Sequence, residues 1–354
     1  MNDKDKLLHL EVMRILAIVF VILNHTGIYG SILFAEYSPD TIQYWIYLAV
    51  SIFEKMAVPL FFSISGAIML NRSNEPMTKL CHKIIKMIGI LLLFSFIYYI
   101  IDRINGKLLS ISEALKIIYS DTIRDPLWFL YLYIGYLIIL PFLRILVQNM
   151  SKLHFMYMFA LAVFFNGLPV IEYLSCSDGI TINEHLRIEW LSNWAVLYPC
   201  LGFYLQHKVK YESIHKMLPY IWTINIVAII LSAYMSYKHS MIEGYSSESF
   251  HRNFLIFNCA AIYISVRWIF ERRSINLPCT CLIRSVGRCT FGIYLLHLFF
   301  MGKFFFIPIM EKLQASALND MICVFIVTLF IVLLSYAITL ILSKIPIVKK
   351  IVGF

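Results

Sequence analysis

The feature that most constrains this chain is a series of long apolar runs separated by short polar stretches. Of its 354 residues, 60% are hydrophobic and 14% are charged, whereas about a quarter of a soluble domain is charged. A helix that crosses a bilayer needs about 20 apolar residues, so the chain can hold at most about a dozen. The sequence therefore predicts a polytopic membrane protein whose chemistry lies in or beside the bilayer.

Polar or Gly- and Pro-containing breaks divide the chain into ten expected spans. They lie near 12–30, 45–70, 84–102, 127–147, 153–171, 190–206, 217–237, 254–270, 290–310 and 321–342. The first has no small-residue cleavage site after it, which favours a retained span over a removed signal peptide. The predicted fold class is all-α: a polytopic helical bundle that forms one domain over residues 1–354, with a short interfacial helix at 111–120.

The charges predict the orientation of the bundle. An N-terminus in the cytoplasm places 20 of the 30 Lys and Arg residues in inner segments and 15 of the 21 Asp and Glu residues in outer ones. Inner loops of membrane proteins carry an excess of Lys and Arg. Both termini are therefore expected in the cytoplasm, and the net charge of +9 is interpreted as topology, with no nucleic-acid partner.

The eight cysteines indicate neither a disulfide framework nor a metal site. Only Cys176 falls in a segment expected outside, where one thiol cannot form an internal disulfide. Cys279, Cys281 and Cys289 share one basic segment, but they lack the usual zinc-ligand spacing and a histidine partner. Free cytosolic thiols and no bound metal are expected.

Two ionisable residues in the first apolar run are candidates for function. Arg14 lies near its expected inner end, and His25 follows eleven residues later. Eleven helical steps return to within about 20° of the same direction and rise about 16 Å. Arg14 alone is equally well explained as a positive-inside anchor, but ionisable groups inside a bundle are usually functional.

The second span carries Glu54 and Lys55 ahead of VPLFFSISG (58–66). Neighbouring helical residues point about 100° apart, so these two side chains are expected to face different partners. They are expected to face a cavity or to lie at the outer interface, because lipid exposure is costly. Pro59 leaves the Lys55 carbonyl without its helical donor and predicts a bend, and Gly66 allows close helix packing.

Further candidates are cations and aromatic residues near the ends of later spans. Arg72, Lys79 and Lys83 lie in a short basic segment that positive-inside bias explains, although converging cations also bind phosphate. Trp128 is equally typical of an aromatic belt. Tyr294 and His297 are three residues apart and therefore share a helical face, where His297 is as readily structural as functional.

Taken in order, several segments resemble the acyltransferase-three family of integral membrane acyltransferases. They are Arg14-x10-His25, VPLFFSISG (58–66), LWFLYLYIGYLIILPFL (127–143), YPCLGFYL (198–205) and TFGIYLLH (290–297). No one segment is specific to the family, but the ordered set is, and it covers nearly the whole chain. The short form here is most similar to members that modify lipid-linked or nascent polysaccharides.

The resemblance implies a membrane enzyme that moves an acyl group, usually acetyl, from cytosolic acetyl-CoA or another acyl-CoA to a hydroxyl of a surface glycan or lipid-linked sugar. Its expected place is the bacterial cytoplasmic membrane, among lipids. Arg14 and His25 match the family's essential pair. The expected roles are catalysis for His25 and Glu54, donor binding for Arg14, Arg72, Lys79 and Lys83, and acceptor binding for Lys55, Trp128, Tyr294 and His297.

The chain departs from the family at some of these positions. Lys79, His82 and Lys83 stand where members often have arginines, Lys55 stands where the short form often has arginine, and Leu298 replaces a common proline. Lysine binds phosphate as a point charge without the bidentate fork of arginine. These departures affect the assignment of the donor site more than the resemblance to the family.

Several alternatives stay open at the level of sequence. The chain can instead be a transporter or flippase of glycans or lipid-linked sugars, since buried ions also line translocation paths, or a scaffold that has lost catalysis. His25 can serve as general base or accept the acyl group itself. The sequence does not separate acetyl from succinyl, and it identifies neither the acceptor nor the oligomeric state.

Overall fold

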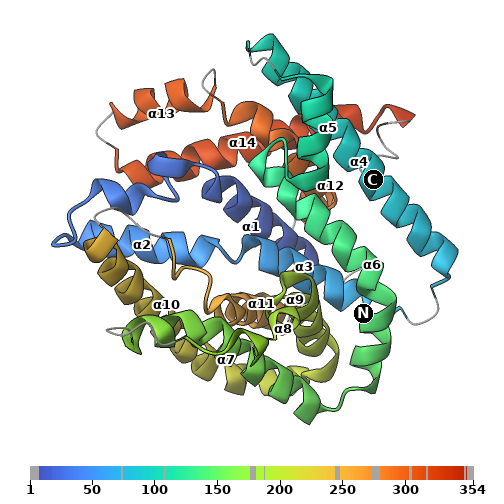
Figure 1. Ribbon diagram of the computed structural model, residues 1–354, viewed down its shortest axis with the longest axis vertical. Helices are drawn as coiled ribbons and strands as arrows, with labels where there is room; N and C mark the ends of the chain where they lie inside the picture. Colours follow the sequence, from blue (N-terminus) through green and yellow to red (C-terminus); the bar gives the residue numbers. More distant parts are fainter. Residues whose placement is uncertain are drawn as a thin grey trace. The chain divides into compact units, whose positions relative to one another are not determined.

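The protein is all-helical throughout the part of the chain that its computed structural model describes (Figure 1). That part comprises residues 8–72, 75–106, 109–175, 181–186, 188–243, 248–272, 280–302, 305–315, 318–346 and 348. The helices are α1 (Leu8–Asn24), α2 (Ile42–Glu54), α3 (Ala57–Met69), α4 (Met77–Ile104), α5 (Ile111–Ser120), α6 (Trp128–Asn149), α7 (Lys152–Ser175), α8 (Glu189–Ser192), α9 (Trp194–Phe203), α10 (Tyr211–Glu243), α11 (Leu255–Arg272), α12 (Thr280–Phe300), α13 (Phe306–Gln314) and α14 (Asp320–Leu342).

The predicted all-α membrane class is confirmed. Six of the described helical segments are long and apolar enough to cross a membrane, with α2 and α3 counted as one of them. Each of the ten expected spans falls on helix, and the short helix predicted at 111–120 is α5. The cytoplasmic placement of the termini stays a prediction.

Three span boundaries were wrong. The first helix ends at Asn24 instead of running to residue 30, because Gly27 adopts φ +57°, a conformation typical of glycine outside helices. The span expected at 190–206 is divided at Asn193, whose side chain accepts the Ala195 N–H at 2.9 Å and caps α9. The span expected at 290–310 ends at Phe300, shortly before Gly302, and is followed by the separate helix α13.

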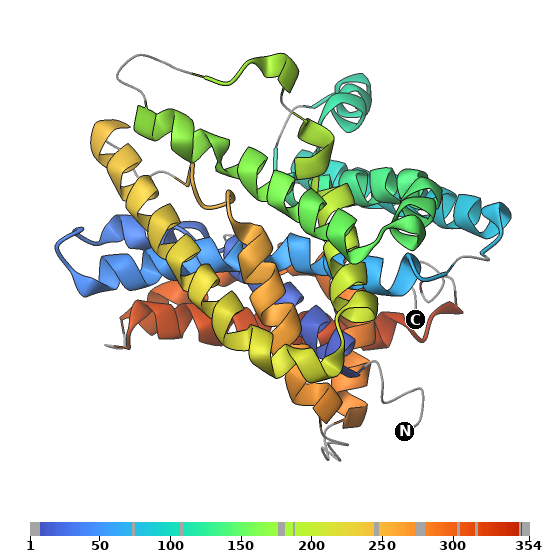
Figure 2. The ribbon, with the colours of Figure 1, turned by 90° about the horizontal axis from the view of Figure 1, so that it is seen from below.

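The chain forms two compact units, one of residues 1–67 with 151–354 and one of residues 68–150. In the first unit, α1 packs against α12, α14 and α11, and α10 packs against α11 and α2. Figure 2 shows α10 and α11 running beside each other. Helix α1 therefore has neighbouring helices of the first unit on several of its sides.

A close crossing of α3 and α9 depends on two glycines in the first unit. A Cβ atom at Gly66 would lie 2.0 Å from the Pro199 carbonyl oxygen, and one at Gly202 would lie 1.8 Å from the Ser63 carbonyl oxygen. Only glycine permits backbones to approach this closely. The close packing predicted for the VPLFFSISG segment is confirmed.

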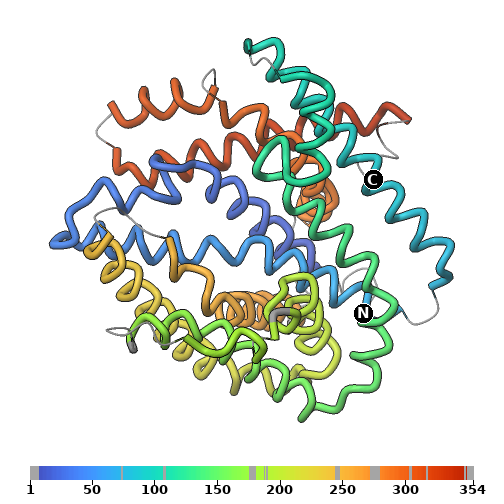
Figure 3. Tube along the Cα trace, in the orientation of Figure 1, coloured from blue at the N-terminus to red at the C-terminus, as the bar shows by residue number. Residues whose placement is uncertain are grey.

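The predicted bend before Pro59 is also confirmed. Helix α2 ends at Glu54, Lys55 and Met56 form a turn, and α3 begins at Ala57 (Figure 3). Helical bonding resumes where the Leu60 N–H donates to the Met56 carbonyl at 2.8 Å. The break gives Lys55 a position at a helix end instead of within a continuous span.

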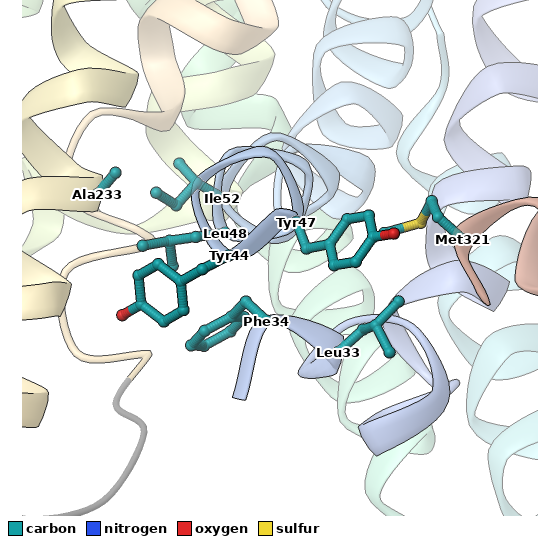
Figure 4. Close-up of a cluster of buried hydrophobic side chains, with 8 residues drawn as sticks. All are labelled: Leu33, Phe34, Tyr44, Tyr47, Leu48, Ile52, Ala233 and Met321. Carbon is teal, nitrogen blue, oxygen red and sulfur yellow. The ribbon is translucent and has the colours of Figure 1, made fainter. Parts of the chain in front are cut away.

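An aromatic and aliphatic cluster covers the start of α2 (Figure 4). Its buried members are Leu33, Phe34, Tyr44, Tyr47, Leu48, Ile52, Ala233 and Met321. At its edge, the Tyr37 hydroxyl donates to Asp320 Oδ2 at 2.7 Å, which raises the pKa of Tyr37, and the Asn319 amide donates to the Tyr47 hydroxyl at 2.9 Å. These bonds connect α14 to the segment between α1 and α2.

The second unit is formed by α4, α5 and α6, with α4 packed against both other helices. Helix α5 begins with a capping box in which the Ser110 side chain binds the Glu113 N–H and the Glu113 carboxylate binds the Ser110 N–H. Such reciprocal bonds satisfy otherwise unpaired donors at a helix start. An ion pair between Arg124 and the buried Asp102 connects the segment before α6 to α4.

Candidate functional site

His25 lies in a rigid turn directly after α1. Its N–H donates to the Ile22 carbonyl at 3.1 Å, and the next residue, Thr26, uses its hydroxyl to donate to the Leu23 carbonyl at 2.6 Å. The same hydroxyl accepts the Ser31 N–H at 3.1 Å. These backbone bonds fix the position of His25. The residue is half-buried and therefore retains some exposure.

The His25 ring stacks on the ring of His297 from α12. Their centroids are 5.5 Å apart and their planes differ by 24°. His297 is fully buried, and its Nδ1 atom lies 2.5 Å from the Tyr294 carbonyl oxygen. A carbonyl oxygen can only accept, so Nδ1 carries the proton and Nε2 is left with a lone pair. Nε2 has no hydrogen-bond partner among the described residues.

Tyr294, predicted to share a face with His297, lies beside it. The two rings have centroids 5.9 Å apart at an angle of 36°, and Tyr294 is buried. The structure therefore brings three of the predicted residues, His25, Tyr294 and His297, into one stack. Sequence spacing predicted the Tyr294–His297 proximity but contained no signal for the contact between α12 and the end of α1.

Lys55 forms the second part of the site. Its ammonium donates to Asn24 Oδ1 at 2.5 Å and to Glu248 Oε1 at 2.9 Å. It also lies 3.8 Å from Glu54 Oε1. The expectation that Glu54 and Lys55 are too poorly placed to neutralise each other was therefore wrong, because the turn at Lys55 brings the two charges together. Lys55 nevertheless has further partners, on α1 and on the segment before α11.

Glu54 is completely buried. Within the described part of the chain, neither of its carboxylate oxygens has a hydrogen-bond partner. A buried carboxylate usually has hydrogen bonds that offset its desolvation. Glu54 therefore supplies two unused acceptor atoms next to the Lys55 ammonium.

His251 adds another buried imidazole, which the sequence did not identify. Its Nδ1 atom lies 3.3 Å from Ser51 Oγ, one helical turn before Lys55, and its ring lies 5.8 Å from that of Phe34. Burial, followed by the nearby Lys55 and Arg252 charges, lowers the pKa of His251 well below its usual range.

The opposite end of α1 has a simpler arrangement. Arg14 Nη1 donates to Glu11 Oε1 at 2.7 Å, one turn earlier on the same helix. The Arg14 side chain is 28% exposed, so it remains partly accessible. This geometry leaves guanidinium donors available to an anion.

The other expected donor-site cations belong to the second unit. Arg72 and Lys79 are exposed, whereas Lys83 pairs with Glu75. Glu75 also accepts from Arg144 at 2.6 Å, and Arg144 donates to the Met69 carbonyl at 3.0 Å. Despite the opposing effect of burial, the hydrogen bonds from Lys83 and Arg144 lower the pKa of Glu75 to about 2.

Comparison with known families identifies the chain. The sequence model of a family described as an acyltransferase domain matches residues 7–340. The chain belongs to the acyltransferase-three family. Searches of curated proteins and of solved structures give no match. The resemblance carried by the ordered segments is thereby confirmed, and the protein is a membrane acyltransferase.

Trp128 of this acyltransferase begins α6 in the second unit and is half-buried. The structure thus groups the predicted residues in two sets. His25, Glu54, Lys55, Tyr294 and His297 lie in the first unit around the end of α1, and Arg14 lies in the same unit at the start of α1. Arg72, Lys79, Lys83 and Trp128 lie in the second unit.

A buried polar cluster of the acyltransferase near the start of α1 was not found from sequence. Gln206 Oε1 lies 2.9 Å from His9 Nε2 and accepts from the Tyr263 hydroxyl at 2.8 Å. Arg267 donates to Glu271 at 3.0 Å and binds the Leu205 and Val209 carbonyls. Leu205 lies within the short π-helical segment Tyr204–Lys208 and Val209 directly follows it, so Arg267 satisfies acceptors at an irregular helix end.

The acyltransferase shows no group of three His, Cys, Asp or Glu side chains arranged to hold a metal ion within its described residues. Cys281 and Cys289 are free thiols, whereas Cys176 and Cys279 lie outside the described residues. The polar groups around His25 are the stacked imidazole of His297 and the Lys55 ammonium, which Asn24, Glu54 and Glu248 share. Their arrangement favours acid–base chemistry and hydrogen bonding to a substrate.

Proposed function

We propose that the protein transfers an acyl group, most often acetyl, from cytosolic acyl-CoA to a hydroxyl of a surface glycan or lipid-linked sugar. The observation that carries the proposal is the stack of His25 on His297 beside the buried Lys55 network. A half-buried imidazole held by a rigid turn suits proton transfer. The family supplies the reaction class, an acyltransferase.

In the first of two routes, His25 acts as general base. The acceptor hydroxyl gives its proton to the imidazole while its oxygen attacks the thioester carbonyl carbon. The carbon–sulfur bond then breaks, and the coenzyme A thiolate takes the proton from the imidazolium. His297 would hold the plane of the His25 ring throughout, because its own Nδ1 proton is bound to the Tyr294 carbonyl.

In the second route, His25 accepts the acyl group. The imidazole nitrogen attacks the thioester, coenzyme A leaves as the thiolate, and the acceptor oxygen later displaces the imidazole. The unused acceptor atoms on Glu54 and His297 support either route, since they suit a hydroxyl-rich acceptor. A labelled acyl-protein that depends on His25 and that acceptor then discharges would select the second route.

Arg14 is proposed to hold coenzyme A phosphates at the cytoplasmic face, with Arg72, Lys79 and Lys83 as further cations. Guanidinium groups bind phosphate through charge-assisted, often paired hydrogen bonds. The exposure of Arg14, Arg72 and Lys79 supports this role. Lys55, Trp128 and Tyr294 are proposed for the acceptor side, and the bacterial cytoplasmic membrane is the proposed location.

The test is transfer from acyl-labelled acetyl-CoA in vesicles that hold the purified protein in one orientation. Donor goes on the side bearing the termini, and a lipid-linked sugar is present in the membrane. Label that becomes covalently bound to the sugar supports the proposal. Movement of the sugar across the membrane without acylation would contradict it and favour a flippase. A parallel reaction with succinyl-CoA identifies the acyl group.

A further inference from the structure

Glu11 occupies an unusual position between Arg14 and α12. One carboxylate oxygen accepts from Arg14 Nη1 at 2.7 Å. The other, Oε2, is buried and has no hydrogen-bond partner among the residues described by the structure. A Cβ atom at Gly287 of α12 would lie 2.3 Å from Oε2. The glycine therefore provides the space that this carboxylate fills.

This ion pair is a weak candidate for a stabilising role. Partly exposed pairs three or four residues apart on one helix contribute little to stability. Burial of Oε2 without a partner opposes even that gain. The arrangement is better explained by an effect on Arg14, whose side chain remains 28% exposed and whose donors outnumber the single bond to Glu11.

We propose that Glu11 is a counter-charge that limits how tightly Arg14 holds the phosphates of acyl-CoA and of the coenzyme A product. The inference rests on the proposed donor role of Arg14. A carboxylate 2.7 Å from the guanidinium lowers the positive potential that an incoming phosphate meets. The same bond keeps the guanidinium in place, so Glu11 is a positioning residue that also weakens anion binding.

The chemical reason for such a weakening is that donor and product carry the same phosphates. A site that binds these phosphates too tightly would retain spent coenzyme A after the acyl group has left. Phosphate contacts that bind the donor and the transition state equally tightly lower KM but give no gain in turnover once the donor is saturating. Glu11 would therefore lower the affinity for the donor and, by the same effect, speed the release of coenzyme A.

The test uses Glu11→Gln, which keeps the side-chain size and an oxygen that can accept from Arg14 but removes the charge. The expected result is a Kd for coenzyme A about tenfold lower, equivalent to about 1.4 kcal/mol. The KM for acetyl-CoA falls with it, and kcat falls because product release slows. Glu11→Ala, which also removes the acceptor, is expected to tighten binding by a smaller factor.

Three controls identify the source of the change. Glu311→Gln removes the same charge from an exposed position on α13 and is expected to leave the Kd unchanged. Glu11→Asp keeps the charge and is expected to stay within about twofold of the natural protein. In the Arg14→Ala background, Glu11→Gln should no longer tighten binding.

Unchanged or weaker coenzyme A binding in both Glu11→Gln and Glu11→Ala would overturn the proposal that Glu11 acts as a counter-charge. This failure differs from failure of the proposed donor site. If Arg14→Ala leaves the Kd for coenzyme A unchanged, the donor role of Arg14 is lost. If Arg14→Ala weakens binding but both Glu11 variants fail to tighten it, only the inference about Glu11 is lost.

Discussion

The two ends of α1 present opposite arrangements of charge. At the start of the helix, Arg14 has one carboxylate partner on its own helix and remains partly exposed. At the other end, His25 stacks on a buried histidine of α12, and the preceding Asn24 is bound to a lysine that also contacts the segment before α11. The first arrangement suits reversible binding of an anion, and the second suits chemistry that requires fixed geometry.

The buried acceptor atoms sharpen this contrast. Glu54 and His297 are both fully buried and keep unused acceptors, at a cost that folding alone does not explain. Polar groups of this kind inside membrane proteins are typical of functional sites. Glu11 Oε2 is also a buried acceptor without a partner. The His25 end of α1 therefore differs in that two such groups, Glu54 and His297, lie beside an ammonium and a stacked imidazole.

The largest effect is expected from removing the charge of Lys55. Lys55→Met leaves Glu54 and Glu248 without their shared cation and is expected to destabilise the protein by about 3 kcal/mol or more. Transfer activity should be lost with it. Thermal unfolding in detergent measures the first effect. Lys55→Arg, which keeps the charge, serves as the control, and unaltered stability in Lys55→Met would contradict the structural role of this network.

A smaller effect is expected at His297. His297→Gln removes the ring that stacks on His25, and a misplaced reacting group can lose about a hundredfold in rate. We expect kcat to fall by up to that factor while the Kd for acetyl-CoA stays unchanged. Exposed His185 on the segment before α8 supplies the control variant His185→Gln. Equal losses in both variants would remove His297 from the reaction centre.

At the other end of α1, Arg14→Ala should affect binding alone. Hydrogen bonds to charged groups contribute about 1.5–3 kcal/mol, so the Kd for coenzyme A is expected to rise roughly tenfold to a hundredfold. Turnover at saturating donor should be largely retained. Isothermal titration with coenzyme A checks the first expectation. A loss of turnover with an unchanged Kd for coenzyme A would contradict the assignment of donor binding to the Arg14 end of α1.

The smallest effect concerns Glu75, an ion-paired carboxylate outside the reaction centre. Its pKa is lowered to about 2 from a usual value of 4.5, so its stabilising contribution is present above about pH 4.5 and is lost as the pH falls toward 2. Glu75→Gln should therefore lower the stability of the protein at pH 7 and weaken its loss of stability between pH 4.5 and pH 2. Thermal unfolding of both proteins across this pH range tests the prediction. An equal loss of stability in both proteins would contradict the ion pairing of Glu75.

Much of the fold was predictable because the length of an apolar run determines whether it can cross a membrane as a helix. Pro59 and Gly66 likewise predicted the bend and the close crossing from local backbone chemistry. The end of α1 was missed because glycine is common within membrane helices, whereas here the turn that ends the helix depends on Thr26 and Gly27.

The site was predictable only in part. His25, Tyr294 and His297 stood out as polar groups in apolar runs, but their contact depends on how α12 packs on α1. Glu248, His251 and Glu11 gave no signal because residues near predicted span ends are commonly charged. Their roles come largely from contacts between distant segments, such as that between Ser51 and His251, which are 200 residues apart.

The most direct test of the account measures donor binding and acyl transfer in one preparation of His25→Ala. The account predicts that the Kd for acetyl-CoA stays within about twofold of the natural protein, since Arg14 is untouched. Transfer to the acceptor should fall by about a hundredfold to ten-thousandfold, the scale of lost general acid–base catalysis. Transfer at an undiminished rate in the reconstituted variant would contradict the placement of the chemistry at the His25 end of α1.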